Sequence, residues 1–135
     1  MAYWRVFYHL VWATKNREPV IASGGEAIIR RSFQLTSDDP GLIVHAVGIM
    51  PEHVHIAISV PPKIAVAEAV KRLKGASSHA VNQHAPGNGF GWQDGYGLHS
   101  LSEKGLPRVC DYVLNQAEHH AKGTTIRAME RIDDD

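Results

Sequence analysis

Residues 50–60 read Met-Pro-Glu-His-Val-His-Ile-Ala-Ile-Ser-Val, a turn followed by a strand that carries two histidines. Side chains alternate between the two faces of a β-strand, so His53 and His55 project from the same face, about 6 to 7 Å apart along the chain. A single metal ion can bridge that separation. The opposite face carries an apolar row, Val54, Ile56 and Ile58. The strand therefore has one face for a core and one polar face for chemistry.

The residues before this strand predict a hairpin, a helix and a central strand. Residues 42–50 predict a second strand, and Pro51-Glu52 is long enough only for a tight turn, so the two strands form an antiparallel hairpin. Residues 2–14 are apolar on both faces, which is typical of a central strand. Residues 25–36 have apolar side chains at helical spacing and end in turn-forming residues, so they predict a helix.

The residues after the hairpin predict two helices and one more strand. Residues 64–84 carry an apolar helical stripe, residues 91–101 predict a strand interrupted by glycines, and residues 107–121 predict a last helix. The first six elements follow the order βαββαβ. That order predicts an α+β, ferredoxin-like (RRM-like) fold, an antiparallel four-stranded sheet with an extra C-terminal helix.

The composition is that of a soluble globular protein. The 135 residues are 44% hydrophobic, so we expect a single domain over residues 1–135. No apolar run is long enough to span a bilayer and no charged-then-apolar leader opens the sequence, so we expect an intracellular, cytoplasmic protein. The single cysteine, Cys110, cannot form an internal disulfide, which fits a reducing compartment.

The charges exclude a global attraction to nucleic acid. Fourteen basic and fourteen acidic residues cancel, so any DNA contact must come from local clusters. The candidates are Lys15 with Arg17, then Lys71, Arg72 and Lys74 in the helix over residues 64–84, and Lys104 with Arg108. Each cluster alone is also what a solvated protein surface looks like.

The last helix carries a second polar pair. Tyr112 and Gln116 are four residues apart and share one helix face, so an amide oxygen can address a metal ion while a phenol addresses a substrate atom. A tyrosine at such a position is also commonly a half-buried core residue, and two histidines on a strand can simply hydrogen-bond each other. His119 and His120 lie near the end of the same helix, where one of them could reach the metal or the DNA. Histidines there also suit the negative end of a helix, and we favour that interpretation.

Together these motifs resemble a known family. His53-Val54-His55 after Pro51-Glu52 is similar to the histidine-hydrophobe-histidine signature of enzymes that nick and join single-stranded DNA. Tyr112-x-x-x-Gln116 is similar to the tyrosine and glutamine of the IS200/IS605-type tyrosine transposases. Residues 8–19, 73–78 and 92–97 resemble that family's opening, second helix and fourth strand.

The resemblance implies a function, a metal and an assembly. It implies cleavage and rejoining of single-stranded DNA at hairpin ends, with Tyr112 as the nucleophile and with His53, His55 and Gln116 as ligands of Mg²⁺ or Mn²⁺. It also implies a homodimer in which the tyrosine helix of one subunit can complete the site of the other. The residues alone favour a different metal, since two imidazoles normally bind zinc or similar ions. Mn²⁺ is an intermediate choice.

The chemistry of a phenol suits the implied reaction. A phenol has a pKa of about 10, so it can attack phosphorus and can also leave again when a 3′-hydroxyl attacks. This predicts a 5′-phosphotyrosine intermediate and a reversible strand transfer.

Three other functions are compatible with the sequence. The first is a domesticated, REP-associated type of tyrosine transposase that nicks hairpin repeats without moving an element. The second is a non-catalytic single-stranded nucleic-acid module, in which Trp92 and Tyr96 stack on bases and no metal is needed. The third is a zinc hydrolase, which the sequence disfavours because no carboxylate or cysteine accompanies His53 and His55 at ligand spacing.

Overall fold

The structure, a computed structural model, describes residues 3–87 and 89–133. Its elements follow one another as β1 (Phe7–Ala13), η1 (Lys15–Arg17), α1 (Ser23–Asp38), β2 (Ile43–Met50), β3 (His53–Ser59), α2 (Val66–His84), β4 (Gly97–Leu101), α3 (Leu106–Leu114), α4 (Gln116–Lys122) and α5 (Arg127–Glu130). The four strands form one antiparallel sheet in the order β2-β3-β1-β4. This confirms the predicted α+β fold.

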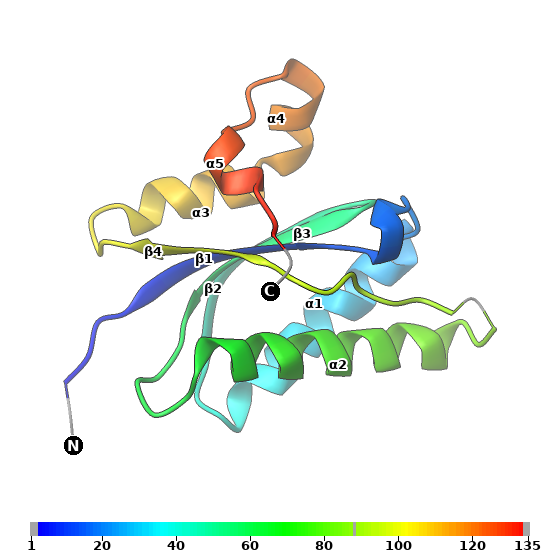
Figure 1. The fold of residues 1–135 in the computed structure, drawn as a ribbon, viewed down its shortest axis with the longest axis horizontal. Helices are drawn as coiled ribbons and strands as arrows, with labels where there is room; N and C mark the ends of the chain where they lie inside the picture. Colours follow the sequence, from blue (N-terminus) through cyan, green and yellow to red (C-terminus); the bar gives the residue numbers. More distant parts are fainter. Residues whose placement is uncertain (1–2, 88, 134–135) are drawn as a thin grey trace.

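The sheet separates two layers of helices. In Figure 1, α1 and α2 lie on one face, and α3, α4 and α5 lie on the other. The sheet face that carries His53 and His55 is therefore covered in part by these three helices. Within the described ranges, no helix has both the length and the hydrophobicity needed to cross a membrane.

The main core lies between the sheet and the first two helices. The apolar row of β3 is completely buried there, together with Leu10 and Trp12 from β1. Helix α1 adds Ile29 and Phe33, and α2 adds Leu73. A smaller apolar cluster of Ala46, Ala57 and Val113 lies on the opposite face, beneath α3. Both faces of the two central strands are thus buried, as the sequence of β1 predicted.

The predicted hairpin is confirmed, since β2 and β3 pair with Met50 opposite His53. The fourth strand is shorter than predicted, because residues 91–96 contribute only isolated bridges such as Thr14 with Trp92. The single helix expected over residues 107–121 is wrong in one respect. It is divided at Asn115, whose backbone (φ −107°, ψ 30°) leaves the helical region and whose side chain donates to the carbonyl of Asp111 at 2.8 Å.

Candidate functional site

The two histidines of β3 project from the sheet toward the second layer of helices. His53 is 1% exposed and His55 is completely buried, and their ring centroids lie 5.0 Å apart. The alternation of the strand predicted this shared face. It did not predict the burial, which comes from the C-terminal helices.

A glycine lets the tyrosine helix lie close to these histidines. A Cβ added to Gly48 on β2 would lie 2.0 Å from the carbonyl oxygen of Val113, so only glycine allows α3 to approach the sheet there. Tyr112, one residue before Val113, has its ring centroid 6.0 Å from that of His55 and is 4% exposed. The phenol and the histidines of one chain therefore share one site.

Gln116 begins α4 and is also buried, and His120 links it to the histidines of β3. Its Oε1 is 3.0 Å from Nε2 of His120, and its amide nitrogen donates to the carbonyl of Tyr112 at 3.3 Å. The ring of His120 is 5.0 Å from that of His53. His120 lies in the last turn of α4, as the helix-end interpretation expects, and its ring also faces the cluster, while the ring of His119 stacks on that of Tyr112 at 4.7 Å.

A carboxylate that the sequence analysis did not identify lies at the centre of the cluster. Oε1 of Glu130, in α5, is 3.1 Å from Nε2 of His55, 3.3 Å from that of His53 and 3.4 Å from that of His120. Tyr112 donates its hydroxyl proton to Oε2 of Glu130 at 2.5 Å. The backbone N–H of Ile126 donates to the same phenol oxygen at 2.9 Å. One carboxylate thus joins the imidazoles to the phenol.

The charges of the cluster depend on these contacts. Burial raises the pKa of Glu130, but its contacts with His53, His55 and Tyr112 outweigh burial and hold that pKa well below its usual range. Burial raises the pKa of Tyr112, and the hydrogen bond to the carboxylate raises it further. Burial lowers the pKa of His55. The resting cluster is therefore an ionised carboxylate beside a neutral phenol.

His9, which had no predicted role, contacts the ring of His55 on the side away from Glu130. Its Nε2 is 2.7 Å from Nδ1 of His55, and both side chains are fully buried. Burial first, and then His55 and His99, lower the pKa of His9 to about 3. A hydrogen bond at Nδ1 orients an imidazole and fixes which nitrogen is free for a ligand. Nε2 of His55 consequently points at Glu130.

The donor set fits a divalent cation. One ligand atom each from His53, His120 and Glu130 lie within 4.8 Å of one another, and Nε2 of His53 is buried without a well-angled hydrogen-bond partner. The 3.3 Å contact of that nitrogen with Glu130 is therefore better regarded as an electrostatic contact than as a hydrogen bond. A buried ring nitrogen without a hydrogen-bond partner calls for another explanation, and a metal ion that binds there would supply one.

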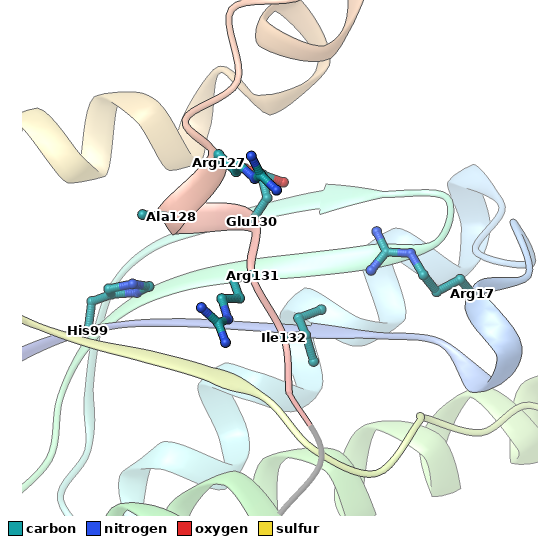
Figure 2. Close-up of a pocket in the computed structure, with 7 residues that line it drawn as sticks. All are labelled: Arg17, His99, Arg127, Ala128, Glu130, Arg131 and Ile132. Atoms are coloured by element: carbon teal, nitrogen blue, oxygen red, sulfur yellow. The ribbon is translucent and has the colours of Figure 1, made fainter.

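The predicted basic residues fall on two sides of the molecule. Lys15 and Arg17 form η1 at the end of β1, and Arg17 reaches into a cavity that Glu130 also lines (Figure 2). Lys71, Arg72 and Lys74 lie on α2, across the sheet from the cluster (Figure 1). Arg72 pairs with Glu68, and Lys74 donates to the carbonyls of Gln93 and Gly95 at 2.9 and 2.8 Å.

Known proteins are similar to this chain in sequence or in fold. The ISDra2 transposase TnpA of Deinococcus radiodurans is 30% identical over 115 residues, which cover 81% of this chain and 82% of that protein. A crystal structure of a protein from Deinococcus radiodurans R1 assigned as a transposase has 28% identity and a TM-score of 0.69, and covers 86% of this chain and 95% of that one. A REP-associated tyrosine transposase bound to a REP hairpin shares the fold, with a TM-score of 0.68, 17% identity and coverage of 89% and 74%.

A family model described as "Transposase IS200 like" matches residues 2–116, which contain β1 to β4, both strand histidines, Tyr112 and Gln116. The match extends over well more than half of the sequence, and the chain belongs to the IS200-like transposase family.

Proposed function

We propose that this transposase cuts and rejoins single-stranded DNA at hairpin ends, with a divalent cation and through a 5′-phosphotyrosine bond to Tyr112. The observation that carries the proposal is the convergence of one phenol, two strand histidines and a carboxylate in a single buried cluster. A chance surface tyrosine would not share a carboxylate with two buried imidazoles.

The cation would be held by His53, His120 and Glu130, with His55 and Gln116 as the further ligands that the family resemblance implies. Bound there, a cation would hold phosphate oxygens and neutralise the charge that develops on them. We propose Mg²⁺ or Mn²⁺. Imidazoles favour borderline metals and carboxylates favour harder ions, so this mixed set supports Mn²⁺ in particular.

Tyr112 would act as the nucleophile and Glu130 as its proton acceptor. The bond between Oη and phosphorus forms while the bond from phosphorus to the 3′ oxygen breaks, and the phenol proton moves to Oε2 of Glu130 along the existing hydrogen bond. Glu130 then returns that proton to the released 3′ oxygen. The N–H of Ile126 stabilises the phenol oxygen when it is the leaving group in the reverse step.

We propose a homodimer and two sets of DNA contacts. One chain already brings Tyr112 to its own histidines, which supports a site complete in cis within the homodimer that the resemblance implies. Arg17 lines a cavity together with Glu130 and would contact the strand near the cluster. Lys15 lines a separate cavity with Val81 and Phe90 and would contact the DNA farther from the cluster. Lys71, Arg72 and Lys74 would contact the hairpin on the far face, although Lys74 would have to release two carbonyls to do so.

The test follows the fate of the two DNA fragments. A single-stranded oligonucleotide with a hairpin and a label at its 3′ end is incubated with the protein and Mn²⁺, then separated under denaturing conditions. We expect the label to move with the protein, because the 5′ phosphate of the downstream fragment becomes bonded to tyrosine. Tyr112→Phe should abolish this adduct and Tyr96→Phe should not. An adduct that persists in Tyr112→Phe refutes the assigned nucleophile.

A metal-dependent phosphodiesterase is the second candidate, and Glu130 is the observation that favours it. The sequence disfavoured a zinc hydrolase because no carboxylate accompanied the histidines, and the structure supplies one. Such an enzyme would release free fragments without an adduct, would keep its activity in Tyr112→Phe, and would lose it in His53→Ala. The non-catalytic alternative loses support, since Trp92 packs against the core and donates to Ser77 at 2.9 Å.

A further inference from the structure

A cavity of about 890 Å³ opens beside the cluster, between η1 and the C-terminal segment, residues 123–133. Figure 2 shows that Arg17 extends into it from η1, while Arg127, Glu130 and Arg131 enter from the C-terminal segment. Cavities of this size hold small ligands, so this one suits a nucleotide or two of a single strand and not a double helix. Its wall at Glu130 is the carboxylate that contacts Tyr112.

The lining of the cavity is rich in guanidinium groups that are available to a ligand. The side chains of Arg17 and Arg127 form no hydrogen bond or ion pair with any residue in the ranges 3–87 and 89–133. Arg131 pairs with Asp133 at 2.9 Å, but both side chains are mostly exposed, so that pair is weak and easily exchanged. Guanidinium groups bind phosphate oxygens in pairs of hydrogen bonds, which makes a phosphate the natural ligand.

The backbone holds Arg17 in a costly conformation. Asn16 and Arg17 have φ angles of 59° and 51°, in the left-handed region that side chains other than glycine rarely adopt. The hydroxyl of Thr14 donates to the carbonyl of Glu18 at 2.6 Å, and the N–H of Arg17 donates to the carbonyl of Thr14 at 2.9 Å, which together close this turn. Retained strain of this kind is typical of functional positions.

An unpaired ring nitrogen supplies an independent sign of a ligand. His99, on β4, lines the same cavity, and its Nδ1 is buried without a hydrogen-bond partner. A ligand that reaches this nitrogen would supply the hydrogen-bond partner that it lacks.

We infer that this cavity is a subsite for the sugar-phosphate backbone of single-stranded DNA next to the scissile phosphate, with Arg17 and Arg127 each contacting a phosphate. The inference rests on the proposed function, because it places the strand so that it leads to Tyr112. Arg127 and Arg131 lie beyond the residues that the family model matches, so the C-terminal segment adds half of this subsite to the shared transposase fold.

The test measures strand binding without chemistry. In a Tyr112→Phe background and in EDTA, a fluorescent, unstructured oligodeoxythymidine is titrated with protein and followed by anisotropy over a series of salt concentrations. Arg17→Ala and Arg127→Ala are compared with Arg31→Ala, an exposed arginine on α1 across the sheet. Thermal unfolding of each variant checks that the fold is retained.

We expect Arg17→Ala and Arg127→Ala each to weaken binding by up to about fivefold, as the loss of an exposed charge contact does. Each should also reduce the slope of log affinity against log salt by about 0.7, the value for one phosphate contact on a single strand. Arg127→Lys should lose less than Arg127→Ala, because it keeps the charge. Arg31→Ala should change neither quantity.

Two results would overturn the subsite. One is a loss in Arg17→Ala and Arg127→Ala no greater than in Arg31→Ala. The other is an equal loss of affinity for a blunt duplex of the same length, which would indicate a general attraction to DNA. The adduct assay separates this inference from the proposed function: strand binding that depends on these arginines supports the subsite even where no adduct forms, and adduct formation without such dependence removes the subsite alone.

Discussion

Mild acid should destabilise this protein through His9, which is completely buried between His55 and His99. Its pKa is lowered from 6.5 to about 3, first by burial and then by the two neighbouring imidazoles. The native state therefore binds fewer protons than the unfolded state between these two values. The stability that the neutral ring contributes is complete above about pH 6.5 and is lost as the pH falls toward 3.

The size of the effect follows from the shift. Each pH unit below 6.5 costs about 1.4 kcal/mol, so lowering the pH from 7 to 5 should remove about 2 kcal/mol from the free energy of unfolding through His9 alone. That is a large part of the roughly 5 to 15 kcal/mol that stabilises a typical domain. The pKa of His55 is lowered by burial as well, so the total loss in the native sequence should be larger.

Urea unfolding in EDTA at the two pH values, followed by tryptophan fluorescence, measures this loss. His9→Gln keeps a polar group toward His55 but cannot titrate, so its stability should fall by about 2 kcal/mol less than that of the native sequence over the same interval. His79→Gln, at an exposed position on α2, should behave like the native sequence. If His9→Gln and the native sequence lose the same free energy, with equal urea slopes, the burial argument for His9 is refuted.

Three further predictions test the packing and the site. In thermal unfolding, Gly48→Ala should destabilise the fold by about 1 to 3 kcal/mol or more, and it should reduce adduct formation, since its Cβ would meet the carbonyl of Val113 at 2.0 Å. Gly75→Ala, with open space around it on α2, should instead stabilise the fold by up to about 1 kcal/mol in the same measurement. Glu130→Gln should lower the pKa of the Tyr112 phenol, because a neutral amide does not repel the negative charge of the phenolate. Ultraviolet titration, taken as a difference from Tyr112→Phe, measures this pKa, and an unchanged or higher value would contradict the prediction. Lys74→Met should cost about 1 to 3 kcal/mol of stability, because it leaves the carbonyls of Gln93 and Gly95 without their donor. Lys71→Met should leave the urea midpoint unchanged, and equal midpoints for the two variants would show that Lys74 is not structural.

The sequence predicted the parts of the site that depend on local periodicity. Alternation along β3 placed His53 and His55 on one face, and the helical repeat placed Tyr112 and Gln116 one turn apart. The strand pattern persists because strand geometry fixes it, whatever the rest of the chain does. Tyr112 and Gln116 still contact each other, although the helix is divided between them at Asn115.

Glu130 had no such pattern. It lies 75 residues from His55 in a helix of four residues, within a C-terminal stretch of alternating charges that resembles a solvated tail. The role of His9 was hidden for a related reason: it depends on the pairing of β1 with β3, which brings His9 opposite Ala57 and beside His55, and no spacing within β1 indicates that pairing. Tertiary contacts determine both positions.

The imidazoles and the two groups that contact the phenol of Tyr112 also differ in how they are attached to the fold. His53, His55 and His9 belong to the two central strands, whose amide protons should exchange with solvent only when the whole protein unfolds. Glu130 lies in a helix of only four residues, and the N–H of Ile126 directly precedes that helix. This segment pairs with the sheet edge through an isolated bridge between Tyr96 and Asp133, and segments with so few contacts open at much lower free energy. Deuterium uptake should therefore distinguish a permanent half of the cluster from a half that can be released and re-formed many times within the life of one folded molecule.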